Sequence, residues 1–235
     1  MMHSAVKCPL ASRVGVQELR QKLPVWSRPP CRDGKVTLPP SILGVGFGHS
    51  GSTSLATHMQ NSPYLDFGTT KEHNWFCGRQ GWDMNWSRFV SEFNVDCSTM
   101  RTFDFSPSNH IILHTSHEVR LQCRREFQGM KGVDHIKKLF PPNLHIIFVV
   151  RDPVDKANSE RYSHSGVMKY RLSVGYLLKK GLGLCYADVI EPFMTHFGKA
   201  RVTVVDFNEL LQNATRTVDG LFDVLDVPRH PASYW

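Results

Sequence analysis

Small and hydroxyl-bearing residues gather in one short stretch of the chain, which has the composition of an anion-binding loop. It runs from Gly46 to Ser54 and contains the hydroxyl groups of Ser50, Ser52, Thr53 and Ser54. Successive small residues let backbone N–H groups converge on an anion, and a helix that follows adds the partial positive charge of its N-terminus. An ordinary Gly/Ser turn has the same composition, so the loop alone leaves that alternative open.

The spacing of this loop argues against a nucleotide triphosphatase. Such an enzyme needs the pattern G-x-x-x-x-G-K-[ST]; the spacing from Gly46 to Gly51 fits, but Ser52 stands where the lysine must be. Without that lysine to reach the β- and γ-phosphates, hydrolysis of ATP or GTP has no support. A P-loop kinase or nucleotidase is therefore disfavoured, and the loop is interpreted as a phosphate cradle that lacks the triphosphate machinery.

A second candidate anion-binding pair follows a strongly apolar stretch. Arg151 comes directly after residues 145–150, and Ser159 lies eight positions later, about two turns into an expected helix. A guanidinium can make bidentate contacts with a phosphate, and a serine hydroxyl adds a further hydrogen bond. A surface arginine and a solvated serine would give the same pattern.

Alternating apolar and amphipathic stretches predict the elements that position these residues. Continuous apolar runs predict buried strands at residues 42–46, 145–150 and 201–205. Helices are expected at residues 55–59, at 133–140, from Arg151-Asp152-Pro153 to about Ser163, and at 217–225. This order predicts an α/β fold with a P-loop-like central parallel sheet flanked by helices. Ligands of such sheets bind at the carboxyl ends of the strands, where the loop and Arg151 both fall.

Length and composition predict a single domain preceded by an arm. The chain has 235 residues, of which 41% are hydrophobic. Residues 1–40 combine a short helical candidate at 16–23 with five later prolines and are interpreted as an arm or linker; residues 41–235 are interpreted as the domain. No run approaches the roughly 18 apolar residues of a spanning helix, and the first residues lack the apolar run of a signal peptide. As written, the chain is expected to be soluble.

The charge of the chain narrows the class of its partners. A formal net charge of +7 favours an anionic partner, such as a nucleotide, a phosphate, an acidic glycan, a nucleic acid or a membrane surface. The basic residues are dispersed, with no aromatic-basic ladder, and this argues against a nucleic-acid partner. No paired carboxylates or histidines at metal spacing demand a metal, so none is expected.

The cysteines and the glycosylation sequons say little about the function of the chain. Six cysteines are scattered without a CxxC pair, which argues against structural zinc, and we interpret them mostly as reduced, packed thiols. The sequons Asn85-Trp86-Ser87 and Asn213-Ala214-Thr215 would matter only in a secreted glycoprotein.

Together, the loop and the Arg–Ser pair resemble the nucleotide-binding elements of the sulfotransferase family, whose sulfate donor is 3′-phosphoadenosine 5′-phosphosulfate (PAPS). In that family a strand-loop-helix of the form [KR]-S-G-[ST]-[ST] holds the 5′-phosphosulfate, and an Arg with a Ser eight positions later holds the 3′-phosphate. The first pattern resembles His49-Ser50-Gly51-Ser52-Thr53, and the second resembles Arg151 and Ser159. The resemblance implies PAPS as co-substrate, bound by these residues and by the adjacent Ser54, without a metal.

Further segments resemble the carbohydrate and heparan-sulfate branch of this family. Lys71-Glu72-His73-Asn74-Trp75-Phe76 is similar to its K-E-x-x-[FY]-F segment, and Ser106-Pro107-Ser108 to its S-P-x-Y element. Residues 183–186 with Phe193 and Phe197 are similar to its G-x-Y segment, and residues 204–211 with 222–227 to its closing strand and helix. The match covers roughly residues 41–227 in the family's order. It implies the sulfotransferase fold and a carbohydrate, or a small hydroxyl or amine, as acceptor.

The chemistry implied by the resemblance is in-line transfer of a sulfuryl group to the acceptor. Such transfer depends on positioning and charge stabilisation. The resemblance places Glu72 as the base that takes the acceptor's proton and His49 as a donor to the bridging oxygen. His73 is a competing base, because an imidazole titrates near neutral pH. Glycan sulfotransferases of this kind are commonly Golgi-anchored, so a Golgi-lumen location is implied if an N-terminal anchor precedes this chain.

The sequence departs from the family pattern in three places. His49 stands where a lysine or arginine usually opens the loop, and Asn109 replaces the tyrosine of the S-P-x-Y element, with Phe105 at a common lysine position. The chain ends soon after the last expected helix, where family members usually continue, which implies a shortened C-terminus. These departures keep a second hypothesis open: a catalytically impaired protein of the same fold that binds a nucleotide or a sulfated glycan.

Overall fold

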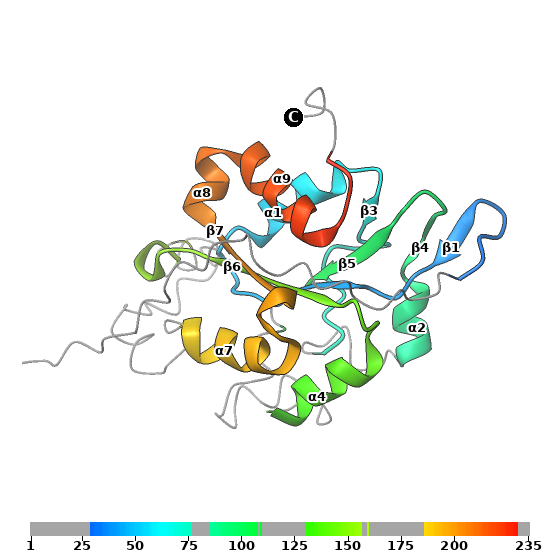
Figure 1. The fold of residues 1–235 in the computed structure, drawn as a ribbon, viewed down its shortest axis with the longest axis horizontal. Helices are drawn as coiled ribbons and strands as arrows, with labels where there is room; N and C mark the ends of the chain where they lie inside the picture. The colour runs from blue at the N-terminus through cyan, green and yellow to red at the C-terminus, as the bar shows by residue number, and fades with distance from the viewer. Residues whose placement is uncertain are drawn as a thin grey trace, which may run out of the picture.

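A five-stranded parallel sheet forms the centre of the molecule (Figure 1). The structure is a computed structural model that describes residues 29–76, 85–107, 109, 130–156, 159 and 186–229. The strand order is β3-β5-β2-β6-β7, and every neighbouring pair is parallel. The strands are β2 (Ile42–Gly44), β3 (Leu65–Asp66), β5 (Arg101–Phe105), β6 (His145–Val150) and β7 (Val202–Asp206). The predicted α/β fold with a central parallel sheet is therefore confirmed.

Helices cover both faces of this sheet (Figure 1). One face carries α1 (Ser52–Gln60), α8 (Phe207–Gln212) and α9 (Ala214–Leu225). The other carries α2 (Trp86–Ser91), α4 (Met130–Leu139) and α7 (Tyr186–Phe197), with a short 3-10 turn, η4 (Lys199–Arg201), leading into β7. The helices expected at 55–59, 133–140 and 217–225 correspond to α1, α4 and α9, while the expected helix at 16–23 lies outside the described residues.

Strand β6 shows why the sheet needs two helical layers. All of its residues except the last are buried. Successive side chains of a strand point to opposite faces, so Ile146 and Phe148 join the hydrophobic cluster under α4 and α7. Ile147 and Val149 join the cluster under α1, α8 and α9. The continuous apolar run therefore reflects burial on both faces, as expected for a parallel strand.

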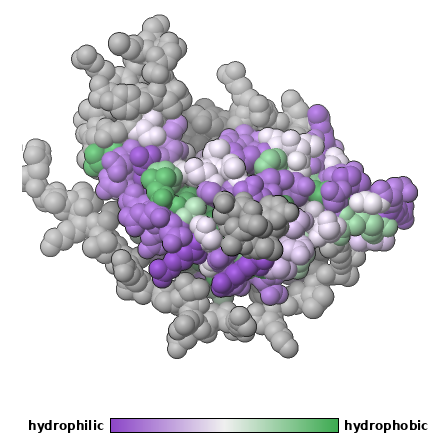
Figure 2. Space-filling model, turned by 90° about the horizontal axis from the view of Figure 1, so that it is seen from above, coloured by the Kyte–Doolittle hydropathy of each residue, from purple (hydrophilic) through white to green (hydrophobic). Residues whose placement is uncertain are grey.

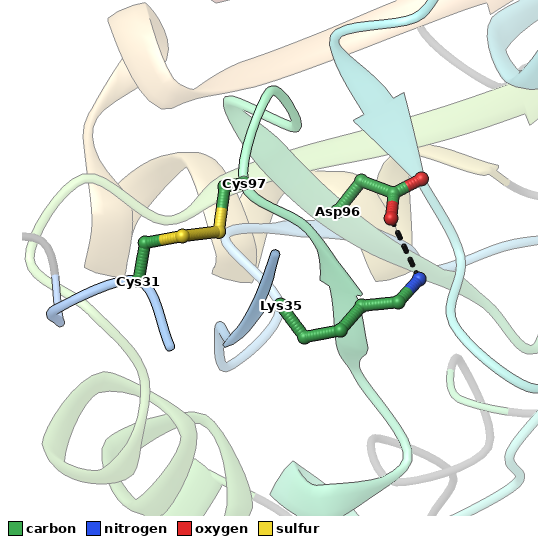
Figure 3. Close-up of a disulfide and its surroundings, with 4 residues drawn as sticks. All are labelled: Cys31, Lys35, Asp96 and Cys97. Carbon is green, nitrogen blue, oxygen red and sulfur yellow. Dashed lines mark hydrogen bonds and ion pairs between the residues drawn. A yellow bond between two sulfur atoms is a disulfide. The ribbon is translucent and has the colours of Figure 1, made fainter. Parts of the chain in front are cut away.

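A small antiparallel ribbon with a disulfide lies to one side of the sheet (Figures 1 and 3). Strand β1 (Lys35–Thr37) pairs with β4 (Asn94–Asp96), and a disulfide joins Cys31 to Cys97. The interpretation of the cysteines as reduced thiols is wrong for this pair. The two cysteines form a disulfide because the pairing of β1 with β4 brings their Cα atoms within 5.8 Å of each other, although they are 66 residues apart in the chain. Residues 31–38 of the expected arm thus pack on the domain, and the boundary at residue 40 stays a prediction.

Removing this disulfide is expected to destabilise the fold. Replacing both Cys31 and Cys97 with serine should lower the free energy of unfolding by about 3 kcal/mol, because the cross-link restricts the unfolded chain. Urea denaturation under non-reducing conditions measures the change. Lys35→Ala is the control, since it removes the exposed ion pair with Asp96 from the same ribbon and should cost under about 1 kcal/mol. Equal denaturation midpoints for the double variant and the wild type would contradict the expectation.

Among the described residues, no helix is both long enough and apolar enough to cross a membrane.

Candidate functional site

The loop between β2 and α1 opens toward the carboxyl edge of the sheet. His49 and Gly51 both have left-handed backbone conformations, with φ of 62° and 92°. A Cβ atom on Gly51 would lie 2.1 Å from the ring of Phe207, so both the conformation and the packing require glycine there. Gly51 is the N-cap of α1, and Ser52 is its first residue. The backbone N–H groups of the first helical turn have no partner within the helix, as an anion site requires.

Arg151 lies directly beside this loop. It follows β6, which is the parallel neighbour of β2, so the two strands end at the same edge of the sheet. The Nη1 atom of Arg151 donates to the backbone oxygen of His49 at 3.5 Å. The two groups that the sequence analysis selected, although separated by a hundred positions in the chain, are therefore in contact.

A helix begins after Arg151 as predicted. Pro153 is its first helical residue, and the carboxylate of Asp152 caps it by accepting from the N–H groups of Val154 and Asp155 at 2.8 and 3.1 Å. Ser159 is helical and half-buried. Residues 161–163, where this helix was expected to end, lie outside the described residues.

One polar atom of this region, Nε of Arg151, is buried without a hydrogen-bond partner among the residues that the structure describes. The hydroxyl of Ser50, in the loop, is buried beside the phenol of Tyr186. Most buried polar groups in proteins are hydrogen-bonded, so an orphaned one calls for an explanation. The Ser50 hydroxyl and the Arg151 guanidinium are both donors that suit an anion, and they belong to the two elements that meet at the carboxyl edge.

Two aromatic residues fix the position of Arg151, and neither has a role that the sequence predicts. The guanidinium carbon lies 4.8 Å from the ring centroid of Phe207, which directly follows β7. The hydroxyl of Tyr186 donates to the backbone oxygen of Arg151 at 2.6 Å, and its ring packs on Phe47 at 4.4 Å. Burial raises the pKa of Tyr186, so the phenol stays protonated as this donor. The only feature of the sequence that could have indicated a role for Phe207 is its position just after an expected strand, at the carboxyl edge of the sheet.

Glu72 lies at the same edge of the sheet, next to β5. The backbone N–H of Phe105, the last residue of β5, donates to the oxygen of Lys71 at 2.9 Å, and Phe105 pairs in register with Gly44 of β2. The ammonium group of Lys71 contacts the carboxylate of Glu72 and donates to the backbone oxygen of Phe105 at 3.4 Å. The Glu72 side chain remains 39% exposed, so its carboxylate can meet a ligand.

A buried carboxylate fixes the segment that carries Glu72. Asp104 accepts from the backbone N–H of His73 at 3.1 Å and from the hydroxyl of Ser106 at 2.7 Å. The Ser106 hydroxyl also accepts from the backbone N–H of Asn74 at 2.9 Å. The His73 ring is buried, with Nδ1 3.3 Å from Asp104 and its face 4.4 Å from the ring of Phe93. This packing turns His73 into the core, while Glu72 stays accessible.

The comparisons with known proteins decide the family. The model of a sulfotransferase family matches residues 40–231. The chain belongs to the sulfotransferase family. No curated protein sequence matches it.

Two solved structures resemble this sulfotransferase in fold. A sulfotransferase from Alicyclobacillus acidocaldarius is 15% identical, with a TM-score of 0.59 over 82% of this chain and 83% of its own. The sulfotransferase domain of the Synechococcus PCC 7002 olefin synthase is 16% identical, with a TM-score of 0.52 over 89% of this chain and 79% of its own. At these identities the likeness shows the fold alone.

The structure also places the positions where this sulfotransferase departs from its family pattern. Phe105 is buried, with its ring where a Cβ atom on Gly44 would lie. Asn109 is buried and donates to the carboxylate of Asp104 at 3.4 Å. Phe105 therefore fills space within the sheet, while Asn109 helps to satisfy the buried carboxylate of Asp104. Within the described ranges, no group of three or more His, Cys, Asp or Glu residues could hold a metal ion.

Proposed function

We propose that this sulfotransferase moves a sulfuryl group from PAPS to a hydroxyl or amine of an acceptor. The observation that carries the proposal is the contact between Arg151 and the loop, together with the unpartnered Nε of Arg151. A doubly phosphorylated nucleotide would supply one anion to the loop and one to Arg151. Residues 50–54 hold the 5′-phosphosulfate at the N-terminus of α1, and Arg151 with Ser159 holds the 3′-phosphate.

In the proposed reaction, the acceptor attacks the sulfur atom in line with the leaving group. A bond forms from the acceptor oxygen or nitrogen to sulfur, and the bond from sulfur to the bridging oxygen of the 5′-phosphate breaks. Glu72 takes the acceptor's proton, and adenosine 3′,5′-bisphosphate leaves. The accessibility of Glu72 and the burial of His73 favour Glu72 as this base. His49 donates to the bridging oxygen as negative charge develops there.

The acceptor is proposed to be a carbohydrate on the strength of the segments around Glu72 and Ser106 that resemble the glycan-modifying branch. The experiment that tests the function is transfer of labelled sulfate from PAPS to a panel of glycans, small alcohols, amines and steroids. Labelled glycans are the expected products. Label on steroids or small alcohols alone would contradict the acceptor class, and no label on any acceptor would contradict the activity.

The second candidate function is binding of the nucleotide with little turnover. It is favoured by His49, which stands where the family usually has a lysine or arginine.

Replacing His49 with lysine is expected to raise sulfate transfer about tenfold, because a cation stabilises the developing charge better than a neutral imidazole. Initial rates of label transfer measure the effect, with His135→Lys on α4, across the sheet, as control. Bisphosphate binding without transfer in both the wild type and His49→Lys would favour the binding protein.

The packing of Phe207 against Arg151 gives a further prediction for the nucleotide. Phe207→Leu is expected to weaken binding of adenosine 3′,5′-bisphosphate about fivefold, because a cation–π contact is worth about 1 kcal/mol. Isothermal titration calorimetry measures the affinity. Phe222→Leu in α9 is the matched control, since it loses similar buried packing without involving Arg151. Equal losses of affinity in both variants would show a general packing effect and contradict the prediction.

A further inference from the structure

The disulfide indicates a compartment in which the two N-x-S/T sequons can be glycosylated. Disulfides form and persist in oxidising compartments and are rare in reducing ones. The Cys31–Cys97 bond joins the segment before β1 to the residue after β4, the strand that pairs with β1. A chain that folds in the secretory pathway meets, in the same compartment, the enzyme that glycosylates N-x-S/T sequences. Each of the two sequons then becomes a candidate modification site whose geometry can be examined.

Asn213 has the geometry of an acceptor that can carry a glycan without disturbing the fold. It lies at the junction of α8 and α9 and is exposed. Its side-chain oxygen caps α9 by accepting from the backbone N–H of Arg216 at 2.9 Å. A glycan attaches to the other side-chain atom, Nδ2, and leaves the oxygen as an acceptor. The cap and the glycan are therefore compatible.

The surface around Asn213 suits a sugar. Asn213 lines an open hollow of about 470 Å³ together with Thr215, Arg216, Asp219, Gly220 and Arg229. These side chains offer donors and acceptors to hydroxyl groups. The coloured surface in Figure 2, which views the molecule from the side of α1, α8 and α9, is largely hydrophilic with several hydrophobic patches. Leu211 of α8 is 65% exposed, so a glycan on Asn213 would lie near one exposed apolar side chain.

Asn85 is a less favourable acceptor. It is also an exposed N-cap, at the start of α2, and its oxygen accepts from the N–H of Arg88 at 2.8 Å. The middle residue of its sequon, however, is Trp86, whose ring packs at 5.3 Å from Trp75 and 5.1 Å from Phe140. The middle residue at the other site is only Ala214. Asn85 therefore serves as the internal comparison.

We propose that Asn213 is an N-glycosylation site and that the chain folds in an oxidising, glycosylating compartment. In the modification, Nδ2 bonds to the anomeric carbon of a lipid-linked oligosaccharide pyrophosphate. The bond from that carbon to the pyrophosphate breaks, and Nδ2 loses one proton. The first sugars lie over the hollow beside α9.

The experiment uses the full chain, expressed behind a cleavable secretion leader in eukaryotic cells. Peptide N-glycosidase treatment should convert Asn213 to aspartate in the peptide map and remove a mobility shift on gels. Thr215→Ala should abolish the shift while keeping the Asn213 cap, so its melting temperature should stay close to that of the deglycosylated wild type, in which an aspartate caps α9 about as well as asparagine does. Asn213→Gln should abolish the shift and also lower the melting temperature, because the cap is lost. Asn85→Gln should leave the shift from Asn213 in place.

An unmodified Asn213 in the secreted protein would overturn the assignment of the site. The compartment is tested on the protein isolated from its source by non-reducing peptide mapping. A linked Cys31–Cys97 peptide together with a glycopeptide containing Asn213 is expected, whereas free cysteines with a bare Asn213 would overturn the proposal. Neither readout depends on sulfate transfer, so the outcome is independent of the proposed activity.

Discussion

Replacing Arg151 with alanine is expected to weaken binding of adenosine 3′,5′-bisphosphate roughly 100- to 1,000-fold, or about 3–4 kcal/mol. The guanidinium is half-buried between the loop and the ring of Phe207, and its Nε has no partner among the described residues. A phosphate bound there makes charge-assisted hydrogen bonds in a place where water competes poorly. Calorimetric titration of the bisphosphate measures the loss.

Two further variants sharpen this result. Arg151→Lys keeps the charge but loses the planar fork, so its affinity should fall between those of the wild type and Arg151→Ala. Arg88→Ala removes an exposed arginine from α2, on the face of the sheet opposite to α1. This variant should bind the bisphosphate as tightly as the wild type does. Since Arg151 also contacts the His49 carbonyl, melting temperatures are recorded for each variant. Unchanged affinity in a folded Arg151→Ala variant would rule out Arg151 as a nucleotide ligand.

Replacing Glu72 with glutamine is expected to lower the rate of sulfate transfer roughly 10²- to 10⁴-fold while leaving bisphosphate affinity unchanged. The carboxamide has nearly the same shape as the carboxylate but cannot accept the acceptor's proton. Initial rates with labelled donor and calorimetry with the bisphosphate separate catalysis from binding. Glu191→Gln, at an exposed position on α7, is the matched control and should retain full activity. Full activity in Glu72→Gln would mean that another group serves as base.

The parts of the site that follow from strand order could be predicted from the sequence. Residues 42–46 and 145–150 are apolar because their strands are buried on both faces, and such strands run parallel in the sheet of an α/β domain. Their carboxyl ends must then lie at one edge, which brings the loop and Arg151 together. The contact at 3.5 Å is a consequence of this topology.

Strand β5 could not be predicted, because its charged residues depend on distant partners. Arg101 is half-buried and donates to the backbone oxygens of Ser41, Asn143 and Leu225. Burial lowers its pKa to about 10, which still leaves it charged at neutral pH. Asp104, at the other end of β5, is satisfied by residues 73, 106 and 109. A five-residue segment that contains an arginine and an aspartate does not have the apolar pattern that predicts a buried strand.

The disulfide and the role of Phe207 were missed for a related reason. Cys31 and Cys97 meet only through the pairing of β1 with β4, and no spacing between them indicates it. Phe207 contacts Gly51 and Arg151, which belong to two other loops at the same edge. Contacts among three segments distant in the chain arise only in the folded molecule. Strand order predicts the edge where they meet but not which side chains touch.

The most direct test of a single site that spans two phosphates is calorimetry of the unmodified protein with three ligands. These are adenosine 3′,5′-bisphosphate, adenosine 5′-phosphate and adenosine 3′-phosphate. We predict that the bisphosphate binds more tightly than either monophosphate, because one end contacts the loop and the other contacts Arg151. Equal affinity for the bisphosphate and one of the monophosphates would show that the loop and Arg151 do not bind the two ends of one nucleotide.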